Sequence, residues 1–178
     1  MKKMMAAVLV GMLGAANLMA QAFGPTGTTN LNVTVASEAA IRVDTANTNL
    51  TSAGSFADFL GTTNYTYKIR TTAVGGSGSV TVQITTDFAP AGGPSVAAPP
   101  DPLDAMTYTC AATLPATACA GTITASTAAA TAVSSFGANA RSLRAGTGGN
   151  SVAWTLPDDP AYATGSYVAV ATFTISAT

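Results

Sequence analysis

The last residues of the chain, Gly165–Thr178, alternate regularly between two kinds of side chain. One set is mainly apolar and consists of Tyr167, Ala169, Ala171, Phe173, Ile175 and Ala177, whereas the set between them is rich in Thr and Ser. Successive side chains of a β-strand point to opposite faces, so the first set can face a core while the hydroxyls face outward. The pattern predicts a strand over residues 165–178, whose backbone groups need a neighbouring strand.

The rest of the chain contains shorter alternating runs, separated by Gly, Pro, Asn and Asp. They occupy residues 31–35, 39–43, 65–69, 80–84, 106–110, 119–125, 131–136 and 152–156. We expect residues 65–69 and 80–84 to form a central hairpin, residues 56–60 a helical turn, and the stretches 88–102 and 141–150 loops. About eight or nine short strands with almost no helix indicate an all-β, antiparallel immunoglobulin-like sandwich. A closed barrel is the alternative.

The beginning of the chain has the pattern of a secretory signal peptide. Lys2 and Lys3 precede an apolar run over residues 4–19, which ends at the small-x-small site Ala20-Gln21-Ala22. The run is short for a bilayer span of ~20 residues. We therefore expect residues 1–22 to be a cleaved signal peptide and residues 23–178 to be a single β-sandwich domain without a membrane span. Such a protein passes through the periplasm and is secreted or held at the cell surface.

Charged residues are few and spread singly, and histidine is absent. The chain has 7 basic and 8 acidic residues among 178. Nucleic-acid binding requires clustered Lys and Arg, so we expect no nucleic-acid partner. The lack of histidine excludes Ser-His-Asp and Cys-His catalysis and His-ligated zinc. We expect a non-enzymatic protein with no cofactor and no metal. The Thr- and Ser-rich composition fits subunits that pack into fibres or layers, and it equally fits an ordinary secreted β-domain.

The chain has two cysteines, Cys110 and Cys119. In an exported protein such a pair is expected to form a disulfide. Their spacing differs from the Cys-x-x-Cys of redox enzymes, so a structural role is favoured. We place the bond near the tip of a hairpin formed by residues 106–110 and 119–125, with the turn at Leu114-Pro115.

Two acidic pairs are candidate ligand sites. Asp101 with Asp104, and Asp158 with Asp159, lie in proline-bounded loops. Carboxylates there can bind calcium or act as the acid pair of a glycosidase. Asp is also a common turn residue that caps its own backbone, which is the simpler interpretation.

Two other candidates involve basic and aromatic residues. Arg141 and Arg144 share a glycine-containing loop and could bind a carboxylate or a sugar acid, although solvated loop cations are commoner. Trp154 is the only tryptophan and lies in an alternating apolar run. A core position is favoured for it over a surface binding platform.

The C-terminal segment resembles the last strand of chaperone–usher pilin subunits and of the related spore coat U-like secreted proteins. In those families a glycine fourteen residues from the end is followed by alternating apolar residues and a penultimate aromatic. Gly165 occupies that glycine position, and residues 167–175 supply the alternation, whereas Ala177 replaces the aromatic. The resemblance implies that Gly165, Tyr167, Ala169, Ala171, Phe173 and Ile175 belong to an assembly strand. It also implies partners of three kinds: copies of the same chain, other surface subunits, or a periplasmic chaperone.

From these features we expect a secreted structural protein of the cell surface, pilin-like or coat-like, that assembles through strand pairing. The alternative is an extracellular binding module for carbohydrate or another surface ligand. In that case the 88–102 loop with Tyr108, or the 141–150 loop, would form the binding surface.

Overall fold

The computed structural model describes residues 25–178, and the expected signal peptide, residues 1–22, lies outside them. Among the described residues, 25–34 lie outside the compact unit, which is formed by Val35–Thr178. The compact unit contains β1 (Glu38–Val43), β2 (Thr51–Ser52), β3 (Phe59–Arg70), β4 (Gly78–Ala89), the 3-10 turn η1 (Pro102–Asp104), β5 (Thr107–Ala111), β6 (Thr117–Ala118), β7 (Ile123–Thr124), β8 (Thr131–Phe136), β9 (Thr147–Leu156) and β10 (Val168–Ala177).

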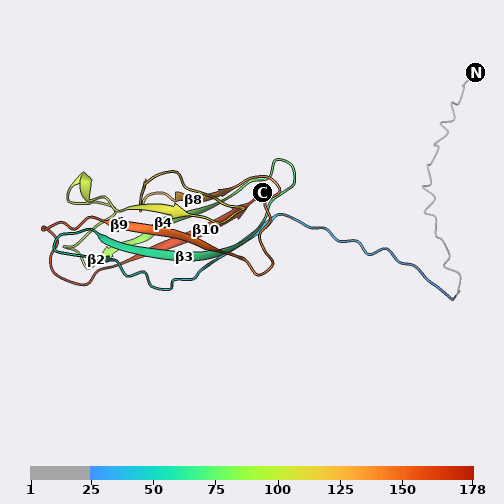
Figure 1. Ribbon diagram of the computed structural model, residues 1–178, viewed down its shortest axis with the longest axis horizontal. Helices are drawn as coiled ribbons and strands as arrows, with labels where there is room; N and C mark the ends of the chain where they lie inside the picture. Colours follow the sequence, from blue (N-terminus) through green and yellow to red (C-terminus); the bar gives the residue numbers. More distant parts are fainter. Residues whose placement is uncertain (1–24) are drawn as a thin grey trace, which may run out of the picture. The chain divides into compact units, whose positions relative to one another are not determined.

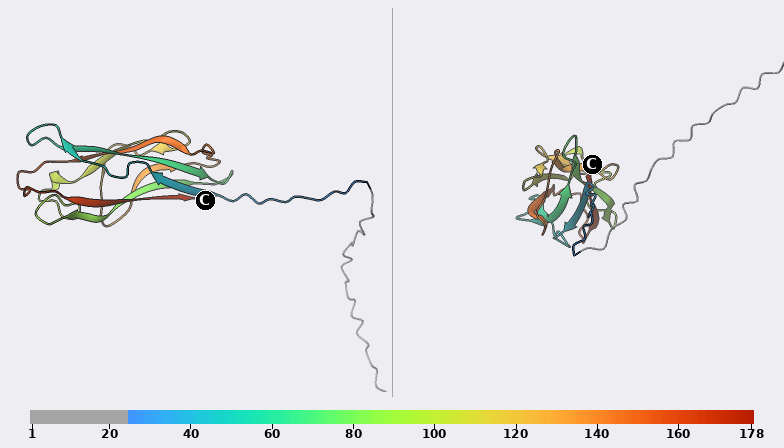
Figure 2. Two further views of the ribbon diagram at one scale, coloured as in Figure 1. Left: turned by 90° about the horizontal axis from the view of Figure 1, so that it is seen from below. Right: turned by 90° about the vertical axis from the view of Figure 1, so that its right-hand side faces the viewer.

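The strands form two antiparallel sheets that lie face to face (Figure 1). The first sheet has the order β1-β3-β9-β5-β7, with β2 paired to the start of β3, and the second has the order β10-β4-β8-β6. The right-hand view of Figure 2 looks along these strands. Two separate sheets confirm the predicted antiparallel β-sandwich rather than a single closed barrel.

The core lies between the sheets and follows from the alternation of the sequence. On β3 the inward residues Tyr65 and Tyr67 are fully buried, and on β4 the same holds for Val80. Across the core, the ring of Tyr67 meets that of Phe136 on β8 edge to face, with centroids 4.9 Å apart. Because one apolar row comes from each sheet, the sandwich buries both rows at once.

The predicted central hairpin of residues 65–69 and 80–84 is wrong. β3 pairs with β1 and β9, whereas β4 pairs with β8 and β10. The connection 71–77 instead crosses from one sheet to the other. At its start the Thr71 hydroxyl donates to the carbonyl of Gly137 and accepts the N–H of Ala140, which anchors the crossing. Alternation fixes which side chains face inward and leaves open which sheet a strand joins.

The disulfide between Cys110 and Cys119 is confirmed, with Cα atoms 5.5 Å apart. The predicted pairing of residues 106–110 with 119–125 is confirmed in part, because β5 pairs with β7 in the first sheet. The place of Cys119 in that hairpin is wrong, because β6, which precedes it, pairs with β8 in the second sheet. Cys110 lies on β5 and Cys119 directly follows β6. The bond therefore joins the two sheets on the side of the sandwich where β6 and β7 are the outer strands.

Three other local predictions differ from the structure. Residues 31–35 form no strand, and residues 56–60 form no helical turn, since β3 begins at Phe59. The predicted 141–150 loop ends early, because β9 begins at Thr147. By contrast, Trp154 is 3% exposed and its indole N–H donates to the Thr63 hydroxyl at 2.9 Å, which confirms the core position.

Candidate assembly site

The side of the sandwich away from the disulfide is open. There β1 ends the first sheet and β10 ends the second, and each is hydrogen-bonded to a strand on one side only. The two strands lie side by side. Their inward side chains, Ala39 and Ile41 on β1 and Phe173 and Ile175 on β10, are only half-buried. Both edges therefore combine free backbone groups with apolar side chains that are incompletely covered.

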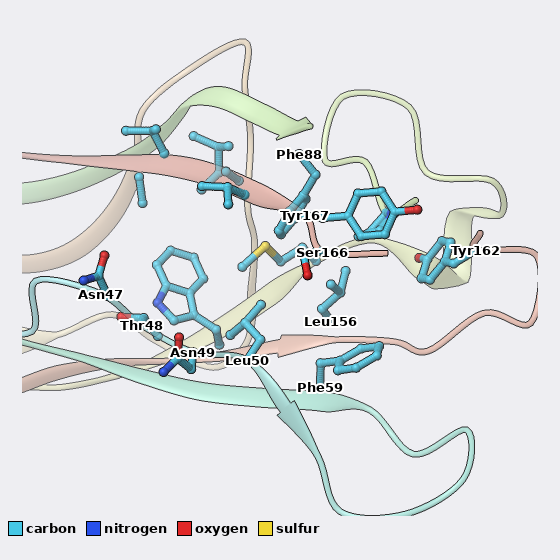
Figure 3. Close-up of a pocket in the computed structure, with 18 of the residues that line it drawn as sticks. Asn47, Thr48, Asn49, Leu50, Phe59, Phe88, Leu156, Tyr162, Ser166 and Tyr167 are labelled. Carbon is cyan, nitrogen blue, oxygen red and sulfur yellow. The ribbon is translucent and has the colours of Figure 1, made fainter. Parts of the chain in front are cut away.

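Beyond the end of β1 the two sheets separate and leave a cavity of about 1120 Å³, which we call the edge groove. Its apolar lining includes Val43, Leu50, Phe59, Phe88, Leu156 and Phe173. Figure 3 shows Asn47, Thr48, Asn49 and Leu50 on one side of it and Phe88, Ser166 and Tyr167 on the other. The volume is slightly above the ~300–1,000 Å³ of typical small-molecule pockets.

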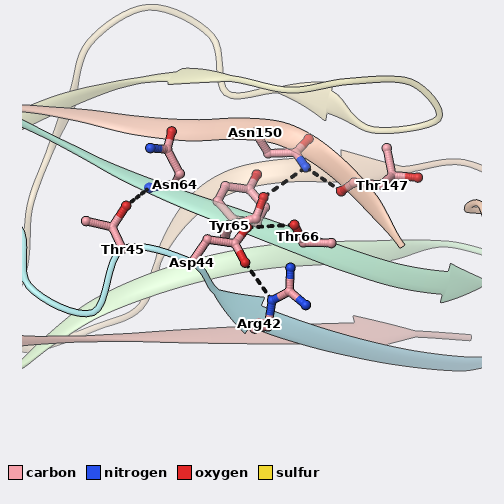
Figure 4. Close-up of polar contacts among 8 residues, drawn as sticks. All are labelled: Arg42, Asp44, Thr45, Asn64, Tyr65, Thr66, Thr147 and Asn150. Carbon is pink, nitrogen blue, oxygen red and sulfur yellow. Dashed lines mark hydrogen bonds and ion pairs between the residues drawn. The ribbon is translucent and has the colours of Figure 1, made fainter. Parts of the chain in front are cut away.

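One rim of the edge groove is a loop held against β3 by side chains (Figure 4). The Asp44 carboxylate accepts from the Thr66 hydroxyl at 2.6 Å and from Nε of Arg42 at 2.6 Å. The hydrogen bond from Thr66, followed by that from Arg42, lowers the pKa of Asp44. Desolvation acts in the opposite direction but is the smaller effect. The Thr45 hydroxyl accepts the N–H of Asn64 at 2.9 Å. β1 ends at Val43, and directly after it the N–H groups of Asp44 and Thr45 both donate to the carbonyl of Asn64 in place of regular strand pairing.

The other rim contains the predicted assembly strand. β10 begins at Val168, so Gly165 and Tyr167 precede it, and the Tyr167 hydroxyl donates to the carbonyl of Ala163 at 2.6 Å. Within the strand, Ala169, Phe173 and Ile175 pack against the core, whereas Ala171 is exposed. The pairing with β4 shifts register between Val168 and Ala171, which bends the strand at the groove. An assembly role for this strand stays a prediction.

The two predicted acidic pairs meet at one end of the sandwich, beside η1. The Asp104 and Asp159 carboxyls interact, and partial desolvation followed by this neighbour raises the pKa of Asp104. Asp101 caps η1 by accepting the N–H of Leu103 at 2.8 Å. Within residues 25–178 no group of three or more Asp, Glu, His or Cys is arranged to hold a metal ion. The capping role predicted for Asp101 is thus confirmed.

Tyr162 lies next to these carboxylates. No pattern in the sequence had marked it as a candidate site residue. Its hydroxyl oxygen is buried and has no hydrogen-bond partner. Desolvation, followed by the charges of Asp104, Asp159 and Asp158, raises the pKa of Tyr162 to about 12. The phenol therefore stays protonated at neutral pH.

Basic residues gather in a second cleft, of about 670 Å³, lined by Lys68, Arg70, Arg141 and Arg144. The loop cations Arg141 and Arg144 reach the end of β3 because Arg141 forms an isolated bridge with Arg70. Sequence analysis singled out Arg141 and Arg144 but not their place beside Lys68 and Arg70, because about 70 residues separate the two pairs in the chain.

Tyr108 and Trp154, the two aromatic residues considered for a binding surface, are both buried. Tyr108 is 1% exposed, its hydroxyl donates to Thr131 Oγ1 at 2.7 Å, and its ring meets that of Trp154 with centroids 5.1 Å apart.

Within residues 25–178 no helix is long and apolar enough to cross a bilayer. Comparison with family models, with curated proteins and with solved structures finds no match for this chain.

Proposed function

We propose that this chain is a secreted, non-enzymatic structural subunit of the cell surface, pilin-like or coat-like, that assembles by strand pairing at the edge groove. The observation that carries the proposal is the open side of the sandwich. Two edge strands, β1 and β10, each paired on one side only, border a half-covered apolar row and a cavity of about 1120 Å³. An edge of this kind accepts an added strand, which supplies backbone hydrogen bonds and inserts alternate side chains.

A segment with the required pattern is present in the chain itself. Leu31, Val33 and Val35 alternate with polar residues and are 92%, 85% and 60% exposed. Residues 25–35 belong to no strand, and residues 25–36 carry no charged side chain. A strand of alternating apolar residues becomes stable when one face is buried. In this proposal the segment 31–35 of a second copy pairs with an edge strand of the first and places its apolar residues in the edge groove.

The test uses two neighbouring substitutions in that segment. Val33→Asp places a charge on the apolar face, whereas Asn32→Asp places the same charge on the opposite face. Both positions are exposed, so both variants keep the fold of the parent. We expect the parent and Asn32→Asp to form oligomers in sedimentation velocity as concentration rises, and Val33→Asp to remain monomeric.

Two results would contradict the proposal. A parent that stays monomeric at every concentration removes the assembly function altogether. Equal assembly of all three proteins would show that the segment 31–35 is not the added strand. A synthetic peptide of residues 28–37 provides a second readout, because it should bind the parent and inhibit assembly.

A second function, binding of a surface ligand, is favoured by one feature of the same groove. The amides of Asn47 and Asn49 line it together with the ring of Tyr162. Amide and aromatic groups together are common in carbohydrate sites. Glycan-array binding that is lost on Asn47→Ala would favour this alternative, and an array without signal would remove it.

A further inference from the structure

The charged residues of the compact unit collect at its two ends. Four of the five basic residues in the described part of the chain line the basic cleft. This cleft lies where β3 ends, at Arg70, and we call that part of the molecule the basic end. Lys68, Arg141 and Arg144 are exposed, and none of the three is in an ion pair among residues 25–178. Only Arg70 is paired there, with Glu38 at 3.1 Å.

The opposite end carries carboxylates. Asp58 directly precedes β3 and Asp158 follows β9, and the pairing of Phe59 with Leu156 brings these two termini together. Asp101, Asp104 and Asp159 lie close by, and we call this group the acidic end. β3 has 12 residues, so at ~3.3 Å per residue the two ends are about 40 Å apart.

In the part of the chain that the structure describes, no cation compensates the acidic end. The four basic residues outside β1 in this part lie at the basic end, and Arg42 on β1 is paired with Asp44 at 2.6 Å. Mutual repulsion among unpaired carboxylates is relieved when a cationic surface docks on them. Desolvation, and then the neighbouring carboxyl of Asp159, raise the pKa of Asp104.

We propose that successive copies of this chain associate head to tail, with the basic end of one copy against the acidic end of the next. The inference rests on the assembly function proposed above and adds the surface and the polarity of the contact. A contact between two different surfaces of the same chain does not close on itself and propagates into a filament.

Two placements support this polarity. The edge groove reaches the acidic end, since Asp158 and Asp159 line it. Val35, the residue that follows the unit containing Leu31 and Val33, lines the basic cleft. A copy that docks with its basic end against this acidic end therefore brings its own segment 31–35 to the mouth of the groove. Electrostatic attraction and strand pairing then act at the same junction.

The test reverses the charge of each end separately. Arg141→Glu with Arg144→Glu removes the positive charge excess of the basic end. Asp58→Lys with Asp158→Lys leaves three carboxylates beside two lysines at the acidic end and so removes most of its negative charge. None of these four side chains makes a hydrogen bond or ion pair in the described structure, so both variants should fold as the parent. Thr109→Glu is the control, because it adds a negative charge at an exposed position of β5 that lines neither the edge groove nor the basic cleft.

We expect each double variant alone to need about tenfold or more protein than the parent to assemble in light scattering and sedimentation. An equimolar mixture of the two should recover one contact and form heterodimers, because the unchanged basic end of one variant meets the unchanged acidic end of the other. Parent assembly should weaken between 20 mM and 500 mM salt, as expected when the Debye length shortens. Thr109→Glu should assemble as the parent.

Three results would overturn the inference. Double variants that assemble like the parent would show that the charged ends do not meet, while the strand-pairing function would stand. A mixture that fails to recover, or loss confined to the basic-end variant, would show that the basic cleft binds something other than the acidic end. A parent that never assembles refutes the proposed function itself, and with it this contact.

Discussion

The ring of Phe173 lies 5.9 Å from that of Tyr65, centroid to centroid, with the planes tilted by 34°. Tyr65 is fully buried on β3 of the first sheet, whereas Phe173 is half-buried on β10, the edge of the second. The contact joins the two sheets where the edge groove begins, since Phe173 also lines that groove. Phe173 thus belongs both to the core and to the candidate assembly site.

Phe173→Asp should destabilise the fold, whereas Thr174→Asp should not. The first change removes an apolar ring from the core edge and places a charge there, at a cost of about 2 kcal/mol or more. Thr174 is exposed on the opposite face, where a substitution changes stability by about 0.5 kcal/mol or less. Urea unfolding followed by tryptophan fluorescence measures both. Equal midpoints for the two variants would contradict an inward-facing Phe173.

The sequence predicts most strands, because alternation marks each inward row. It does not predict the pairing, since the row of Tyr65 and Tyr67 could face that of Val80 and Val82 either within one sheet or across a core. The disulfide between Cys110 and Cys119 could be predicted because the chain has only these two cysteines. That the bond links the two sheets could not be predicted, because it depends on the pairing of β6 with β8.

The candidate site was less accessible to sequence reasoning than the fold. Asp58 and Asp158 come together only through the register of β3 with β9. Asn150 is a further example. Its side-chain amide donates to the carbonyls of Thr147 and Tyr65, at the point where the pairing of β3 with β9 shifts register. A single buried Asn forms no recognisable pattern in the sequence. Such features depend on long-range pairing, which local periodicity does not encode.

Reduction of the Cys110–Cys119 bond should lower stability without changing the fold. On the chain-entropy model a short closed loop stabilises by about 2 to 3 kcal/mol. Because the bond lies on the side away from the edge groove, the Cys110→Ser/Cys119→Ser variant should unfold at lower temperature and still assemble when folded. Mass spectrometry of exported protein should show two protons fewer than in the reduced form. Free thiols after export would contradict the predicted compartment.

Stability should fall at acid pH through Asp87, which organises the loop that follows β4. Its carboxylate accepts from the Ser95 hydroxyl at 2.6 Å and from the N–H groups of Val96, Phe88 and Ala97. Desolvation raises its pKa, but these hydrogen bonds outweigh it and the pKa of Asp87 lies below its ordinary value.

A carboxyl with a lowered folded-state pKa stabilises the fold above its unfolded value of about 3.9, and this stabilisation is lost as pH falls through the folded-state pKa. Thermal unfolding between pH 6 and pH 2 measures the loss. Asp87→Asn should be less stable than the parent at pH 6, with the difference shrinking below about pH 4. A constant difference across this range would show that the charge of Asp87 contributes nothing.

Tyr162→Phe should leave stability unchanged or raise it by up to about 1 kcal/mol. Its hydroxyl oxygen is buried without a hydrogen-bond partner, so removing it leaves no group unsatisfied and relieves a desolvation cost. Tyr108→Phe is the matched control, because that hydroxyl donates to Thr131 Oγ1 at 2.7 Å and lies 2.9 Å from the carbonyl oxygen of Ala132. Its loss should cost about 1 kcal/mol. Urea unfolding of both variants distinguishes the two cases, and an equal loss in each would mean that Tyr162 has a partner in solution.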